Sequence, residues 1–112
     1  MLKKNLLLQA SLEAEKSPVK IATHGALILL RNKIIAKGYN NYNPFAYGTY
    51  STHAEVQAIN NALMKVHKDK LKSAKLVVVR LTKEGCLSNS FPCQNCQRYI
   101  KRFGINVVYY SS

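Results

Sequence analysis

Two residue types that can do acid–base and metal chemistry stand close together in the stretch STHAEVQAIN, residues 51–60. They are His53 and Glu55, and Glu55 is one of only five acidic residues in a chain of 112. Glu55 extends by one turn the apolar face of a predicted helix. The other members of that face are Ala58, Ile59, Ala62, Leu63 and Val66. A first-turn acid is favoured by the helix dipole, but an inward-facing carboxylate also needs a partner, because burial without one is costly.

A second stretch, FPCQNCQRYI at residues 91–100, places two cysteines at the start of another predicted helix. Cys93 and Cys96 lie three positions apart on one face, which Ile100 continues towards the core. Pro92 suits the first helical position and Ser90 suits the N-cap. On its own, a single CxxC pair is compatible with a buried thiol pair, a redox site or a metal site.

Taken together, the two helix starts favour a metal. An imidazole and two thiolates, from His53, Cys93 and Cys96, are ligands that suit zinc. Three protein ligands leave a fourth position for water, whose pKa zinc lowers towards about 7. Glu55 is near enough in sequence to accept a proton from that water. Cys86 is the alternative fourth ligand, and its participation would close the site.

The pattern His-Ala-Glu followed by Pro-Cys-x-x-Cys resembles the zinc-dependent cytidine and deoxycytidylate deaminase superfamily, whose glutamate is a general acid/base and not a ligand. The resemblance covers roughly residues 20–110. It implies that His53, Cys93 and Cys96 hold Zn²⁺ and that Glu55 shuttles protons while ammonia leaves the base. It also implies an α/β protein with the three-layer α/β/α cytidine-deaminase-like fold.

Substrate contacts are indicated less specifically. The resemblance implies that Asn40 contacts the sugar or base, although an asparagine in a turn is a structural alternative. The backbone N–H of Ala54, beside the metal, is expected to meet the edge of the base. Tyr50 is a candidate for stacking on the base, or it simply covers the long connection at 39–52. Three further aromatic residues share these two interpretations: Tyr42, Phe45 and Tyr47.

Hydrophobic periodicity predicts the elements that must position these residues. We expect helices over 2–15, 53–66 and 93–103, a hairpin of strands over 24–30 and 33–38, and further strands over 75–81 and 105–110. The last two strands flank a helix, so they should run parallel. The result is one domain over residues 1–112, with a mixed sheet of four or five strands flanked by helices. Where the family's fifth strand is missing, a sheet edge needs cover, which favours a homo-oligomer.

The amino-acid composition limits the kinds of partner that the protein is expected to have. Seventeen lysines and arginines give a net charge of +12, which favours an anionic partner such as a nucleotide phosphate or a nucleic acid. Three cysteines, an odd number, fit a reducing compartment. No segment approaches the roughly 20 apolar residues of a membrane span. We therefore expect a soluble cytoplasmic protein with a small-molecule substrate, no membrane partner and nucleic acid as a further candidate partner.

Three functions compete on this basis. The first is zinc-dependent hydrolytic deamination of a cytosine nucleoside or nucleotide, with dCMP the specific candidate because of the basic charge. The second is deamination of a base within RNA or single-stranded DNA. The third is a non-catalytic interaction module stabilised by zinc, which predicts four protein ligands including Cys86 and no need for Glu55.

Overall fold

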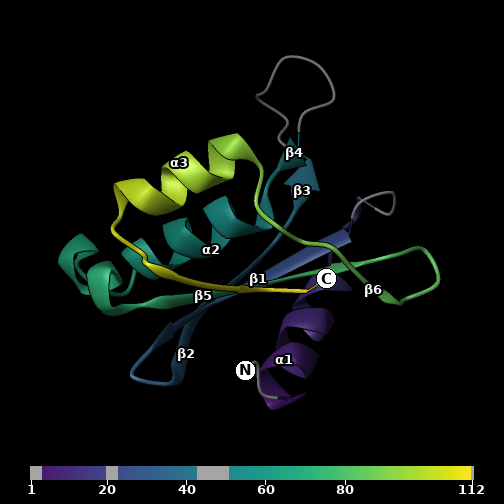
Figure 1. Cartoon of the computed structure of the whole chain (residues 1–112), viewed down its shortest axis with the longest axis horizontal. Helices are drawn as coiled ribbons and strands as arrows, with labels where there is room; N and C mark the ends of the chain where they lie inside the picture. Colours follow the sequence, from purple (N-terminus) through teal and green to yellow (C-terminus); the bar gives the residue numbers. More distant parts are fainter. Residues whose placement is uncertain (1–3, 20–22, 43–50, 112) are drawn as a thin grey trace.

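The computed structural model of the chain describes residues 4–19, 23–42 and 51–111 (Figure 1). The elements in chain order are α1 (Lys4–Ala14), β1 (Thr23–Leu30), β2 (Lys33–Tyr39), β3 (Asn41–Tyr42), β4 (Ser51–Thr52), α2 (Ala54–Leu63), the 3₁₀ helix η1 (Lys68–Ser73), β5 (Lys75–Leu81), β6 (Leu87–Ser88), α3 (Gln94–Arg102) and β7 (Val107–Tyr110). No described helix is both long and apolar enough to cross a membrane.

The main sheet is mixed and has five strands, as the sequence predicts at its upper limit. Strands β2, β1 and β5 are antiparallel neighbours, and both β6 and β7 pair with β5. Strand β7 runs parallel to β5, with Val107 opposite Lys75, which confirms the predicted crossover through a helix. The fifth strand, β6, lies within a segment that the sequence analysis leaves as a loop, because two residues carry no readable periodicity.

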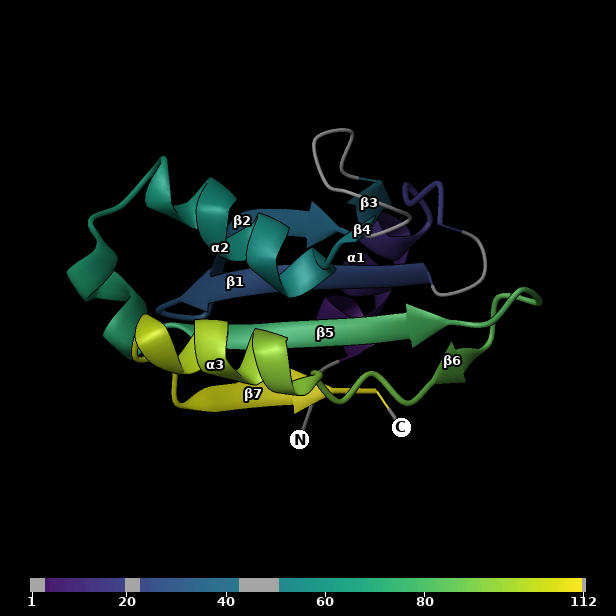
Figure 2. The same cartoon turned by 90° about the horizontal axis from the view of Figure 1, so that it is seen from above.

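Helices cover both faces of the sheet, which gives three layers (Figure 2). Helix α1 packs on one face over Leu27, Leu29 and Val77, and α2 and α3 cover the other face over Ala26, Ile28 and Val78. Strand residues alternate between these two clusters, as the period of two in a strand requires. The central strands are therefore buried on both sides, which explains their almost continuous apolar sequence.

Close packing against β2 sets the position of α2. A Cβ atom on Gly38 would lie 2.6 Å from the backbone oxygen of Ala54 and still closer to the backbone nitrogen of Ala58, so only glycine allows the first turn of α2 to approach the strand this closely. Two side chains of α2 bond the strand: Gln57 accepts a hydrogen bond from the Tyr39 N–H at 2.7 Å, and Asn61 donates one to the Lys37 oxygen at 2.8 Å. The start of α2 is thereby fixed over the sheet.

Helix α2 ends at Leu63, three residues before the predicted end. The lysine-rich segment that follows forms η1, and the ring of His67 accepts a hydrogen bond from the Asp69 N–H at 3.2 Å and caps it. Helix α3 ends at Arg102, and Gly104 just beyond it has a φ of 76°, in the left-handed region that glycine adopts without strain.

Candidate metal centre and active site

Helices α2 and α3 start next to each other, and in each the N-cap residue is one of the predicted ligands. His53 is the N-cap of α2 and Cys93 is the N-cap of α3, and neither side chain makes a capping hydrogen bond. This is unusual, because an N-cap side chain normally accepts a bond from the first turn. Here both side chains are available to bind something else. Cys93 thus takes the N-cap position that the sequence analysis assigns to Ser90, and α3 begins after Pro92.

The three predicted ligands form one cluster. The Nδ1 atom of His53 lies 3.0 Å from the Sγ atom of Cys96 and 3.7 Å from that of Cys93, and all three ligand atoms lie within 4.8 Å of one another. A tetrahedral zinc ion with ordinary bond lengths holds nitrogen and sulfur ligands about 3.5 Å apart. The donor set and its spacing therefore fit Zn²⁺.

Cys96 is buried and Cys93 is exposed. Burial raises the pKa of the Cys96 thiol strongly, and the nearby Glu55 carboxylate and Cys93 raise it further. Without a cation, the buried sulfur therefore keeps its proton. A cation in the cluster would replace that proton, since metals bind the thiolate.

Glu55 lies in the first turn of α2 with only 4% of its surface exposed. Its carboxylate raises the pKa of the Cys96 thiol and lines the same cavity as His53 and Cys93, so it faces the cluster, as its position on the apolar face predicts. A carboxylate beside a dithiol cluster at a helix N-terminus has two favourable partners, the helix dipole and the cation that the cluster can hold. The structure thus supplies the partner that the buried acid requires.

A cavity of about 250 Å³ opens beside the cluster. Two of the predicted substrate contacts, Asn40 and Ala54, line it, and their contact with a substrate stays a prediction. The remaining candidate, Tyr50, lies outside the described residues. The complete lining is His24, Asn40, His53, Ala54, Glu55, Ser90, Phe91 and Cys93. The sequence analysis does not assign His24, Ser90 or Phe91 to this cavity. Of these three residues, Phe91 could have been predicted to lie near the site, because it stands two residues before the predicted ligand Cys93.

Asn40 is fixed by a buried network. Its Oδ1 atom accepts a hydrogen bond from the His24 N–H at 2.8 Å, and its backbone oxygen accepts one from the Ser17 hydroxyl at 2.6 Å. Ser17 is completely buried and comes from the segment after α1. Asn40 is 4% exposed, so these bonds give it a structural role beside the cavity, and its contact with a substrate stays a prediction.

Ser90 and Ser111 tie the segment before Cys93 to the sheet. The Ser90 hydroxyl donates to the Val78 oxygen at 2.8 Å and accepts from the Ser111 N–H at 2.8 Å. The Ser111 hydroxyl donates to the Ser88 oxygen at 2.6 Å and accepts from the Arg80 N–H at 3.1 Å. These bonds join β5, β6 and the end of β7 just upstream of the ligand-bearing helix. Ser90 is therefore a tether for this segment.

Cys86 is not part of the cluster that the described residues form. It is exposed and lies in the turn between β5 and β6, where its N–H donates to the Thr82 hydroxyl at 3.1 Å. The described residues therefore supply three protein ligands, the arrangement that leaves a coordination position open in a catalytic zinc site.

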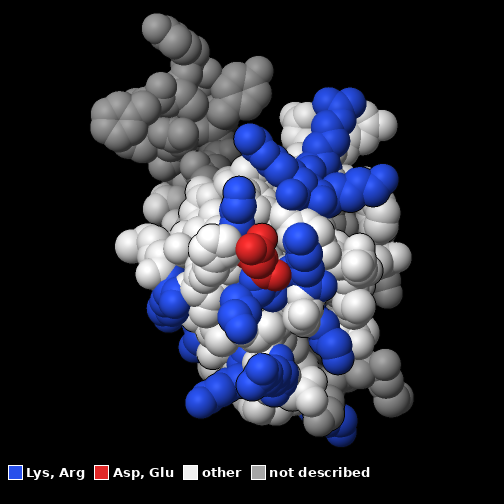
Figure 3. Space-filling model, turned by 90° about the vertical axis from the view of Figure 1, so that its left-hand side faces the viewer, with Lys and Arg blue, Asp and Glu red and all other residues white. Residues whose placement is uncertain are grey.

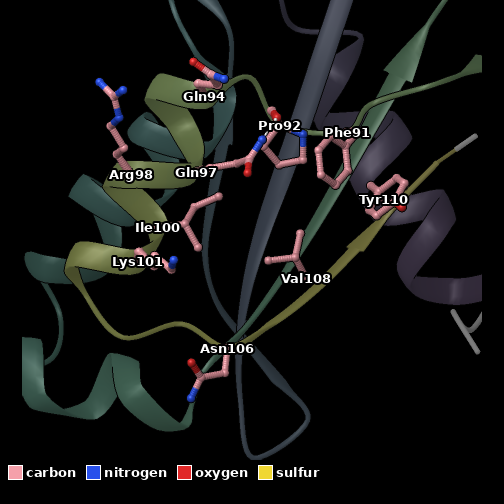
Figure 4. Close-up of a pocket in the computed structure, with 10 residues that line it drawn as sticks. All are labelled: Phe91, Pro92, Gln94, Gln97, Arg98, Ile100, Lys101, Asn106, Val108 and Tyr110. Atoms are coloured by element: carbon pink, nitrogen blue, oxygen red, sulfur yellow. Dashed lines mark hydrogen bonds between the residues drawn. The ribbon is translucent and has the colours of Figure 1, made fainter.

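A larger hollow of about 560 Å³ lies between α3 and β7 (Figure 4). Ile100 and Val108 point into it, and Phe91 and Tyr110 lie at its right-hand end in this view, with ring centroids 5.0 Å apart. None of the three ligands and no carboxylate lines it, so its size does not make it the reaction site. It lies along β7, which pairs with β5, and the homo-oligomer stays a prediction.

Comparisons with known proteins agree with this geometry. A family model described as "Cytidine and deoxycytidylate deaminase zinc-binding region" matches residues 2–112. A cytidine deaminase from Burkholderia pseudomallei has a similar structure, with a TM-score of 0.74 at 22% identity over 96% of this chain and 83% of the other. A dCMP deaminase from the cyanophage S-TIM5, solved in complex with dCMP and dUMP, has a TM-score of 0.62 at 19% identity, covering 98% of this chain and 83% of that one.

A further similar structure is part of a larger protein. It belongs to a diaminohydroxyphosphoribosylaminopyrimidine deaminase/reductase from Thermotoga maritima, with a TM-score of 0.62 at 25% identity over 95% of this chain and 28% of that one. No curated protein sequence matches the chain. The family model covers nearly the whole sequence, and the structure brings the zinc-binding residues of its motif together. The chain therefore belongs to the cytidine and deoxycytidylate deaminase zinc-binding family.

Proposed function

We propose that this protein catalyses zinc-dependent hydrolytic deamination of a cytosine nucleoside or nucleotide. The observation that carries the proposal is the buried Glu55 beside a three-ligand cluster that opens on a cavity. A structural zinc site normally has four protein ligands and needs no buried carboxylate next to it. The third hypothesis, a non-catalytic zinc module, required Cys86 as a ligand and is disfavoured by the position of Cys86 outside the cluster.

We assign each residue of the cluster a role in the proposed reaction. In the proposed reaction His53, Cys93 and Cys96 hold Zn²⁺, which lowers the pKa of a bound water when it is present. Glu55 takes a proton from water and delivers it to the base, so that a C–O bond forms and the C–N bond breaks. One water is consumed, cytosine becomes uracil and ammonia leaves. Because Glu55 is almost fully buried, it carries this proton without competition from bulk water.

The walls of the cavity favour binding of a small planar base. Asn40 and the backbone N–H of Ala54 provide polar groups for its edge, and Phe91 offers an aromatic face. No lysine or arginine is among the described lining residues. His24 is the described lining residue outside the cluster whose side chain can carry a positive charge. The lining therefore supports a cytosine base as the bound group, and dCMP is the specific candidate on the net charge of +12 alone.

Deamination of a base within RNA or single-stranded DNA is the second candidate. The net charge of +12 favours it, because a polynucleotide extends beyond the cavity and can use basic side chains elsewhere. The described cavity lining contains no lysine or arginine, so the cavity itself does not favour a polynucleotide over a free nucleotide as the substrate.

Ammonia release from a panel of substrates tests the proposal. The panel contains cytidine, deoxycytidine, CMP, dCMP, adenosine, guanine and short single-stranded oligonucleotides. We expect turnover of at least one free cytosine compound and a loss of about 100-fold to 10,000-fold in kcat for Glu55→Gln, the usual range for a general acid/base. Zinc content measured on both proteins must be equal. If both zinc-loaded proteins are equally inactive on every compound, the proposed deaminase activity is refuted.

A further inference from the structure

Several lysines and arginines gather on one side of the molecule. Figure 3 shows the side formed by the ends of α2 and α3 and by η1, where basic side chains surround a small acidic area. We define the basic face as Lys65, Lys68, Lys70, Lys72 and Arg102, all of which are exposed. Lys72 packs next to Gly104, just beyond the end of α3, so η1 and the end of α3 form one continuous surface.

The charges of the basic face are not neutralised within the described part of the chain. The described ion pairs join Lys16 to Glu13 and His67 to Asp69, and no member of the basic face belongs to one. Asp69 is the acid that lies among these lysines, and it is engaged at 3.3 Å by His67. The other four acids lie on or after α1, in the proposed active site and in the turn after β5. The basic face therefore repels itself unless an anion binds it.

Favourable interactions with helix dipoles explain the positions of only some of the cations of the basic face. Arg102 is in the last turn of α3, and Lys70 and Lys72 are in the last turn of η1, where a cation gains roughly 0.3–1 kcal/mol from the helix dipole. Lys65 lies after the end of α2 and Lys68 is in the first turn of η1. At a helix N-terminus a cation is unfavourable, so Lys68 is not there to satisfy a dipole.

The basic face is separate from the proposed active site. The ligands and Glu55 belong to the starts of α2 and α3, whereas the basic face lies at and beyond their ends. Helices of 10 and 9 residues are about 14 Å long. None of the residues of the basic face lines the cavity. An anion on this face therefore does not react, and binding there serves docking.

We propose that the basic face is a docking surface for single-stranded nucleic acid, independent of the deamination site. Five exposed cations over two adjoining segments match a chain of phosphates, which they neutralise with release of counterions. An acidic membrane is a poorer fit, because membrane-binding faces combine cations with several apolar side chains that insert. The exposed large apolar residue next to this face among the described residues is Met64.

Binding of a labelled oligonucleotide of about 20 nucleotides to the zinc-loaded full chain tests this inference. Fluorescence anisotropy would measure the dissociation constant between about 50 and 200 mM salt. If five phosphates are contacted, the affinity should fall about 100-fold over that range. Lys68→Glu together with Lys72→Glu should weaken binding by about 10-fold or more at low salt and reduce the salt slope by about 1.4. Deamination of a free nucleotide should not change.

The matched control carries Lys4→Glu and Lys83→Glu, two exposed lysines away from the basic face whose reversal changes the net charge equally. Strong binding by this control supports a local docking surface, and an equal loss in both variants overturns it in favour of diffuse attraction.

Absence of oligonucleotide binding by the unmodified chain overturns the inference too, as does binding to phosphatidylserine vesicles in place of the oligonucleotide. Should the first variant unfold, Lys65→Glu with Lys70→Glu replaces it. The inference stands if the Glu55→Gln protein is inactive yet binds normally.

Discussion

The Nδ1 atom of His53 lies 3.0 Å from the Sγ atom of Cys96, although 43 residues separate them in the chain. The sheet produces this contact, because α2 and α3 both pack on one face and start at the same end of it. Neither helix could place its ligands alone. The metal centre is therefore a tertiary feature, and changes that shift either helix start should disturb it.

The first prediction concerns the cysteines. Cys93→Ser should lose stoichiometric zinc, because a serine hydroxyl is a poor replacement for a thiolate ligand. Cys86→Ser is the matched control and should keep zinc and activity, since Cys86 lies outside the cluster. Metal analysis after gel filtration measures both. Zinc loss in the Cys86 variant would show that the ligand set has been wrongly identified.

The second prediction concerns the contact between β2 and α2. Gly38→Ala places a methyl group 2.6 Å from the Ala54 oxygen, so the first turn of α2 must move. We expect destabilisation of about 1–3 kcal/mol together with weaker zinc binding. Gly85→Ala is the control: no atom lies within 4 Å of its Cβ, and its φ of 84° should cost about 1 kcal/mol. Denaturant unfolding and zinc titration separate the two, and unchanged zinc affinity in the Gly38 variant would contradict the assigned role of this contact.

The third prediction concerns Ser111. Ser111→Ala removes the hydroxyl that bonds the Ser88 oxygen and the Arg80 N–H, which should cost about 1–3 kcal/mol of unfolding free energy. Because the bond to Ser88 helps to hold the segment just before Cys93, zinc affinity should fall as well. The exposed Ser73 provides the comparison, and Ser73→Ala should change neither quantity. A purely structural role for Ser111 would lower stability and leave the zinc dissociation constant as it is.

The fourth prediction concerns Ser17, which positions Asn40 through a 2.6 Å bond to its backbone oxygen. Ser17→Ala should raise KM for the cytosine substrate by several-fold and leave kcat nearly unchanged, because Asn40 is proposed to bind the substrate and not to take part in chemistry. Ser11→Ala, which removes a bond within α1 to the Leu7 oxygen, should not alter KM. An equal fall in kcat would mean that the network supports Glu55 or the ligands instead.

The ligands and the acid could be predicted because each carries its own local signal. His53 and Glu55 start an amphipathic helix, and Cys93 and Cys96 start another, so the face that each side chain occupies follows from helical spacing. Strand β5 was predicted with its observed bounds, Lys75–Leu81, because a run of valines between charged residues has few other interpretations. The family motif then joined the two helix starts.

The supporting polar residues could not be predicted in the same way. Ser17 forms a hydrogen bond with a residue 23 positions away, and Ser90 forms one with a residue 21 positions away. A single serine is not part of a periodic sequence pattern, so the sequence does not indicate such a distant partner. Ser90 looked like a helix cap because serine is a common cap, but Cys93 takes that position. The end of α2 was missed because the capping of η1 by His67 is a local contact that apolar spacing does not report.

The hydrogen bonds of Ser111, close behind strand β7, also bear on the order in which the site can form during biosynthesis. A ribosome makes His53 and α2 well before Cys93, Cys96 and strand β7, which precedes Ser111. Until Cys96 has been made, the chain holds no complete set of the three predicted ligands. The cluster can therefore form only after most of the chain has been synthesised.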